Sequence, residues 1–97
     1  MAFVLRFPAP LPSLGWKVKI RDRERLEPPH VTIFLRRHEW RLGLRCGTFI
    51  VPPGGSWNEI DSRVRKTVEA NWQLLCDEWD RAYPTNRVSE ADGYGNA

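Results

Sequence analysis

Two stretches of the chain alternate between apolar and basic residues, and this pattern restricts the possible folds more than any other feature of the sequence. Residues 16–21 read Trp-Lys-Val-Lys-Ile-Arg, and residues 40–45 read Trp-Arg-Leu-Gly-Leu-Arg. Because successive side chains of a β-strand point to opposite faces of a sheet, each stretch predicts a strand with one buried face and one solvated face. The sequence therefore predicts a sheet that is apolar on one side and positively charged on the other.

Three further segments have the character of short strands. Residues 3–7 alternate before a proline-rich stretch, and residues 48–51 end at a Pro-Pro-Gly-Gly turn. Residues 30–35 alternate as well, and we expect residues 36–38 to form a tight turn from which residues 39–45 return antiparallel. In the strand at 30–35, the apolar face is predicted to hold Val31, Ile33 and Leu35, and the polar face His30, Thr32 and Phe34.

A helical pattern follows the strands. Ser56 and Glu59 form a capping box, in which each side chain can satisfy a free backbone donor near the start of a helix. Apolar residues then recur every three or four positions until Pro84. We therefore predict one long C-terminal helix over residues 57–82, whose apolar stripe consists of Ile60, Val64, Val68, Trp72, Leu75, Trp79 and Ala82.

The chain has 97 residues, which is enough for one domain with a modest core. We predict an α+β domain over residues 1–84, in which a small antiparallel sheet of three to five strands packs against the one long C-terminal helix. Residues 85–97 are polar and lack an apolar period, so they are predicted to be a disordered tail. The predicted core consists of Trp16, Val18, Ile20, Val31, Ile33, Trp40, Leu42, Leu44, Ile60, Val64 and Val68.

The length of the predicted helix suggests self-association. A helix over residues 57–82 would extend about 40 Å, whereas a six-residue strand covers about 20 Å. The end of its apolar stripe, at Trp72, Leu75 and Trp79, would then be exposed in a monomer. Because large exposed apolar patches are unusual, we expect these residues to form a homodimer interface.

The charge distribution indicates a possible anionic partner. Residues 1–50 contain ten Lys or Arg and four Asp or Glu, whereas residues 51–97 contain five and eight. Cations neutralise phosphates, and an exposed aromatic ring can stack on an unpaired base. Solvated strands also carry such cations simply to protect a sheet edge, and the acidic half offers the basic face a protein partner instead. The candidate nucleic-acid-binding residues are Lys17, Lys19, Arg21, Phe34, Arg41 and Arg45.

Catalytic and metal-binding signals are sparse. His30 opens a strand on the predicted polar face, where it is a candidate general acid or base for phosphodiester cleavage, although no carboxylate is placed by the sequence to orient it. The chain has no CxxC, HxxxH, GxGxxG or GK[ST] pattern, so we predict no metal and no cofactor. Cys46 and Cys76 are expected to be reduced. No apolar run reaches the length of a membrane span, and Arg6 and Pro8 interrupt the apolar start, so we expect a cytoplasmic protein without membrane contact.

Four segments, 5–7, 15–20, 28–33 and 70–72, resemble a small bacterial family of unknown function in their order and residues. The family hallmark is Pro-Pro-His, an apolar residue, a second His and an apolar residue, which open a central strand. In this chain Thr32 stands in place of the second histidine, which weakens any metal-binding or catalytic role based on paired histidines. The resemblance implies a compact α+β domain, and members are often encoded in predicted toxin–antitoxin pairs.

The sequence therefore predicts a non-enzymatic, homo-oligomeric binding or regulatory module of a bacterial mobile-element or toxin–antitoxin type. The first alternative is a nucleic-acid-binding protein that uses the basic face of the sheet. The second alternative is a small ribonuclease centred on His30.

Overall fold

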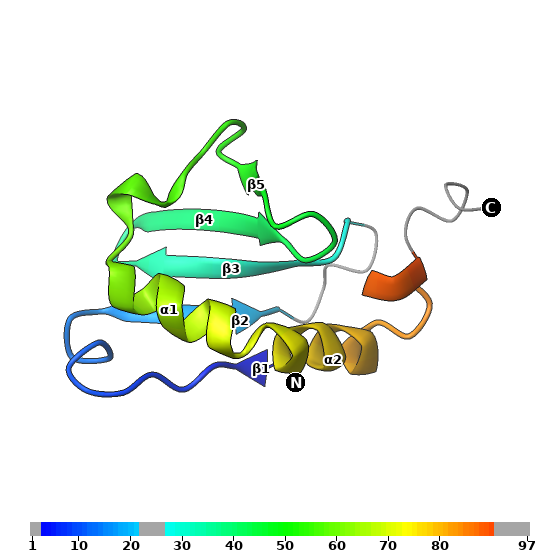
Figure 1. The fold of residues 1–97 in the computed structure, drawn as a ribbon, viewed down its shortest axis with the longest axis horizontal. Coiled ribbons are helices and arrows are strands. Elements are labelled where there is room, and N and C mark those ends of the chain that lie inside the picture. The colour runs from blue at the N-terminus through cyan, green and yellow to red at the C-terminus, as the bar shows by residue number, and fades with distance from the viewer. Residues whose placement is uncertain (1–2, 22–26, 91–97) are drawn as a thin grey trace.

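The computed structural model describes residues 3–21 and 27–90. Five strands form one antiparallel sheet in which the spatial order follows the sequence, so that each strand pairs with its neighbours along the chain (Figure 1). The predicted α+β class with an antiparallel sheet is thereby confirmed. The strands are β1 (Phe3–Val4), β2 (Trp16–Ile20), β3 (His30–Leu35), β4 (His38–Gly43) and β5 (Phe49–Val51).

The register of the central strands confirms the predicted faces. Ile33 of β3 lies between Val18 of β2 and Trp40 of β4, and all three side chains are buried. The turn between β3 and β4 is tight because Leu35 pairs directly with His38, and Arg36 adopts a left-handed conformation with φ of 54°. One face of the sheet is thus continuously apolar, as the alternation requires.

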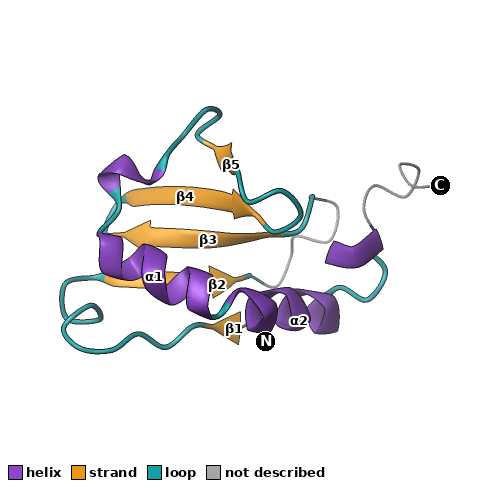
Figure 2. Ribbon diagram, in the orientation of Figure 1, coloured by secondary structure: helices purple, strands orange, loops and turns teal. Residues whose placement is uncertain are grey.

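The helical region differs from the single helix that was predicted over residues 57–82. A short 3-10 turn, η1 (Trp57–Glu59), precedes two helices, α1 (Ser62–Ala70) and α2 (Trp72–Ala82) (Figure 2). Asn71 separates them, with φ of −112° and ψ of 21°. Its side-chain amide donates to the carbonyl of Thr67 at 2.8 Å, and its backbone amide donates to the same carbonyl at 3.1 Å. The apolar period continues across this break, so periodicity alone does not reveal it.

The helix start also lies later than predicted. Ser56 accepts a hydrogen bond from the amide of Asn58 at 3.3 Å, and it therefore caps only η1. Asp61 is the N-cap of α1, because its carboxylate accepts from the Arg63 amide at 2.8 Å. The Arg63 guanidinium binds the same carboxylate, and these hydrogen bonds lower the pKa of Asp61 to about 2. The cap is therefore charged at neutral pH.

Helices α1 and α2 lie on one side of the sheet, over its apolar face (Figure 1). Every residue of the predicted core is buried. The core is larger than predicted, because the segment before β2, strand β5 and helix α2 also contribute to it. These additional buried residues are Leu5, Leu11, Phe49, Leu75, Cys76, Trp79 and Tyr83.

A segment after α2, which we call the C-terminal strap (residues 83–90), binds back onto the domain. The Tyr83 hydroxyl donates to the carbonyl of Arg21, and the Asn86 side-chain amide donates to the carbonyl of Glu27 at 2.7 Å. The strap ends in a 3-10 turn, η2 (Val88–Glu90). Residues 85–90 of the predicted disordered tail therefore have defined structure, and residues 91–97 lie outside the described residues.

The strap changes the interpretation of the distal helical stripe. Leu75 and Trp79 are both 0% exposed within a single chain, and the Trp79 indole donates to the carbonyl of Asn86 at 2.7 Å. Trp72 is only partly buried. The expectation that this stripe is exposed in a monomer is therefore wrong for Leu75 and Trp79, and the predicted dimer interface loses these two residues.

Candidate nucleic-acid interface

The polar face of the sheet is partly covered. His30 and Thr32 belong to this face by register, yet they are only 1% and 0% exposed. The predicted open basic surface is therefore restricted to part of the sheet. The side chains that cover the rest of this polar face determine which of its cations a ligand can reach.

Four charged side chains, Arg21, Glu27, Glu39 and Arg41, form an ion-pair layer on this face. Arg21 Nη2 lies 3.0 Å from Glu39 Oε1, and Arg41 Nη1 lies 2.9 Å from Glu27 Oε1. Arg41 Nε also lies 3.3 Å from Glu39 Oε2. Partly exposed ion pairs add little stability individually, but here two carboxylates neutralise two guanidinium groups. Arg21 and Arg41, which were predicted to bind phosphates, are thus engaged within the protein.

The register explains how this layer covers the face. Arg41 lies directly opposite Thr32, and Glu39 lies directly opposite Phe34. Arg21 follows the last residue of β2, so its guanidinium must reach back along the sheet to contact Glu39 and to lie 4.8 Å from the Phe34 ring centre. Among the described residues the Thr32 hydroxyl has no hydrogen-bond partner. The ion-pair layer therefore covers the middle of β3.

His30 does not occupy an accessible position. Its Nδ1 lies 2.8 Å from the carbonyl of Pro28, and its Nε2 lies 3.8 Å from Glu27 Oε1. Its ring is 5.4 Å from that of Trp79, measured between centres. A general acid or base must come within hydrogen-bond reach of its substrate, so this buried ring does not favour the ribonuclease hypothesis. The geometry instead indicates a structural role at the start of β3.

Arg45 was also predicted to bind nucleic acid, and the structure places it elsewhere. Its guanidinium donates to the carbonyl of Arg87 at 2.6 Å and to that of Val88 at 3.2 Å. It also donates to the side chain of Asn86 at 3.3 Å. Arg45 therefore holds the C-terminal strap, and it is not part of the basic surface around β2 and β3.

The remaining candidates meet in one hollow, which we call the basic pocket: Gly15, Lys17, Lys19, Phe34 and Arg36. Its volume is about 330 Å³. Lys17 pairs directly with Phe34 across the two strands, and the Lys19 ammonium lies 5.7 Å from the Phe34 ring centre. The Phe34 side chain is partly exposed. Three cations, Lys17, Lys19 and Arg36, therefore line one hollow with a partly exposed aromatic ring, and the Arg21 guanidinium lies 4.8 Å from the centre of that ring.

Arg36 also lines this pocket; it is not one of the six candidate residues, although the sequence allows its basic turn to extend the basic surface. The tight turn after β3 brings it beside the two lysines of β2, and Gly15 lies at the same end of the sheet. Lys17, Lys19 and Arg36 form no ion pair with a carboxylate in the described part of the chain. Arg36 directly follows Leu35, which pairs with Trp16 at the start of β2, so Arg36 lies at the same end of the sheet as Lys17.

No family model matches the chain, and neither a curated protein nor a solved structure is significantly similar to it. Among residues 3–21 and 27–90, no three His, Cys, Asp or Glu side chains are grouped so that they could hold a metal ion. None of the helices in this part of the chain is long and apolar enough to cross a membrane.

The two cysteines are free thiols, and we expect them to differ in reactivity. Cys46 is exposed, and hydrogen bonds from the side chain and the backbone of Thr48 lower its pKa, whereas burial raises the pKa of Cys76. Because the thiolate is the reactive form, Cys46 should react first with a disulfide reagent at pH 7.5. Thr48→Val should slow the reaction of Cys46 with the reagent severalfold, and Cys46→Ser should abolish this fast reaction. Equal rates for both thiols in the folded protein would contradict this expectation.

Proposed function

We propose that the protein is a non-enzymatic binding module that binds single-stranded nucleic acid in the basic pocket. The observation that carries this proposal is that Lys17, Lys19 and Arg36 line the same pocket as the partly exposed ring of Phe34. Cations bind phosphates through the release of counterions, and an aromatic ring binds a base by stacking. The pocket combines both kinds of contact within a small area.

The spacing of the cations supports an extended ligand. Lys17 and Lys19 are two residues apart on one face of β2, which separates their Cα atoms by about 6.7 Å. This separation is comparable with that of neighbouring phosphates along an extended single strand. A base stacked on Phe34 must be unpaired, because the flat face of a paired base is covered by its neighbours in the duplex. A single strand therefore fits the pocket better than a duplex.

The test is fluorescence anisotropy with a labelled 12-nucleotide oligouridylate or oligothymidylate at several salt concentrations. If three phosphates are contacted, the logarithm of the affinity should fall with the logarithm of the salt concentration with a slope of about −2. The double variant Lys17→Glu/Lys19→Glu should weaken binding by more than about tenfold at low salt. Phe34→Leu should weaken it by about tenfold through loss of stacking.

A matched control separates this pocket from general charge effects. The double variant Lys66→Glu/Arg81→Glu changes the net charge equally, but its exposed residues lie on α1 and α2. It should bind nearly as tightly as the wild type. Equal weakening by both double variants would show that only net charge matters, and no binding at low salt would refute the proposal.

A further inference from the structure

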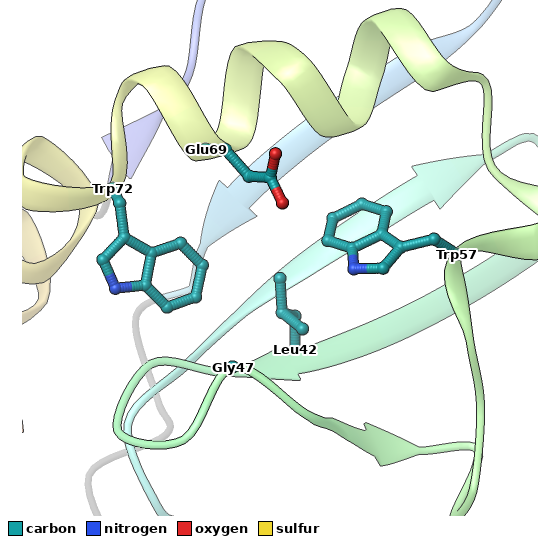
Figure 3. A pocket seen from close by; sticks show the side chains of 5 residues that line it. All are labelled: Leu42, Gly47, Trp57, Glu69 and Trp72. Carbon is teal, nitrogen blue, oxygen red and sulfur yellow. The ribbon is translucent and has the colours of Figure 1, made fainter.

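A second pocket lies on the helical side of the molecule, and we call it the tryptophan pocket. It is lined by Leu42, Gly47, Trp57, Glu69 and Trp72, and its volume is about 240 Å³. Figure 3 shows the two indole rings on opposite sides of this space, with the side chain of Leu42 between them. Leu42 is 0% exposed and closes the floor. The lining residues come from β4, the turn before β5, η1, α1 and α2, so folding alone assembles the pocket.

The chemistry of this pocket combines aromatic walls with one carboxylate. Figure 3 shows the Glu69 carboxylate directed toward the space between Trp57 and Trp72. Glu69 Oε2 accepts from Arg65 Nε at 3.0 Å, whereas Oε1 has no hydrogen-bond partner among the residues described. Both tryptophans are partly exposed, so a ligand can reach their rings. Aromatic faces and a carboxylate are the groups that attract an organic cation.

The protein itself shows that these groups hold a cation. The Arg65 guanidinium lies 5.3 Å from the centre of the Trp57 ring while its Nε is bonded to Glu69. Arg65 thus contacts the Trp57 ring and one of the two carboxylate oxygens of Glu69. Within the described residues, Trp72 makes no cation–π contact and Oε1 of Glu69 accepts no hydrogen bond, and Figure 3 shows both beside the remaining space.

We propose that the tryptophan pocket binds an aliphatic cation, namely a lysine side chain of a partner polypeptide. An anion would lie against the unpaired Oε1 of Glu69, and a neutral apolar chain would cover this oxygen without giving it a partner. The volume is below the range of about 300–1,000 Å³ that is usual for small-molecule sites, which favours a single side chain over a cofactor. This pocket and the basic pocket share no lining residue, so the inference does not depend on the proposed function.

The test compares two peptides by NMR: acetyl-Gly-Lys-Gly-amide and the same peptide with norleucine in place of lysine. The indole N–H resonances of Trp57 and Trp72 should shift with the lysine peptide and not with the norleucine peptide. Glu69→Gln should weaken lysine-peptide binding by about tenfold, and Trp72→Ala should abolish it. Far-UV circular dichroism and thermal melting of each variant confirm that the fold is retained.

A control and a second ligand complete the experiment. Asp77→Asn removes an exposed carboxylate from α2 that is bonded to Gln73 and does not line the pocket, so it should leave binding unchanged. Tetramethylammonium chloride is titrated separately. If this small cation binds more tightly than the lysine peptide, the proposal that the pocket takes a lysine side chain of a polypeptide is wrong. Equal shifts with both peptides, or full binding by Glu69→Gln, would overturn the cation site itself.

Discussion

Replacing Trp79 with alanine is expected to lower the free energy of unfolding by about 3–5 kcal/mol. The side chain is 0% exposed, and its ring lies 4.3 Å from that of Tyr83, measured between centres. Its indole N–H donates to the carbonyl of Asn86 at 2.7 Å. The substitution therefore leaves a cavity in the core and also removes a bond that holds the C-terminal strap. Small domains are stable by only about 5–15 kcal/mol, so this variant should lose a large share of its stability and melt at a clearly lower temperature.

Urea denaturation monitored by far-UV circular dichroism measures this effect. Leu74→Ala is the control, because Leu74 lies on the same helix but is 40% exposed, and its replacement should change the stability by less than about 1 kcal/mol. Sedimentation of the wild type and of Trp79→Ala tests the alternative role of this residue in a dimer. A fully stable Trp79→Ala protein that has lost its oligomeric state would contradict the burial of this side chain within a single chain.

Replacing His30 with alanine is expected to destabilise the protein by about 2–3 kcal/mol. The ring is almost completely buried, it packs near Trp79, and its Nδ1 lies within hydrogen-bond distance of the carbonyl of Pro28. His38 provides a matched control in the same chain, because it is exposed in the turn at the start of β4. His38→Ala should change the stability by no more than about 0.5 kcal/mol.

The same pair of variants tests the ribonuclease alternative. Thermal melting of both proteins is measured together with incubation of a labelled RNA. We expect intact RNA with the wild type and a lower melting temperature only for His30→Ala. RNA cleavage by the wild type that disappears in a fully stable His30→Ala protein would reverse the structural interpretation of this residue.

The sheet could be predicted because its determinants are local. Alternation along one strand decides which side chains enter the core, and Val18, Ile33 and Trp40 occupy the expected face for that reason. The division of the helix at Asn71 could not be predicted from the spacing of the apolar residues, because the apolar stripe continues on both sides of the break. At the division, the Asn71 side-chain amide shares the Thr67 carbonyl with the backbone amide of the same residue, and such local side-chain bonds compete with the regular helical pattern.

The candidate site was only partly predictable, because it depends on contacts between distant residues. Lys17, Lys19 and Phe34 could be assigned to one face from alternation alone. Whether Arg41 is available depends on Glu27, which lies 14 residues earlier and reaches it only in the folded register. The burial of His30 likewise requires Trp79 of α2 to pack beside the start of β3. Such pairings follow from the tertiary arrangement, which the local pattern does not contain.

The order of the strands has a consequence for behaviour at high concentration. The two strands at the margins of the sheet are also its shortest, β1 with 2 residues and β5 with 3, and the pairing of β4 with β5 is irregular between Arg41 and Leu42. Each margin therefore offers only a short row of backbone groups to another molecule. Chains of this protein are expected to resist joining sheet to sheet, so amyloid-like aggregation should require prior unfolding.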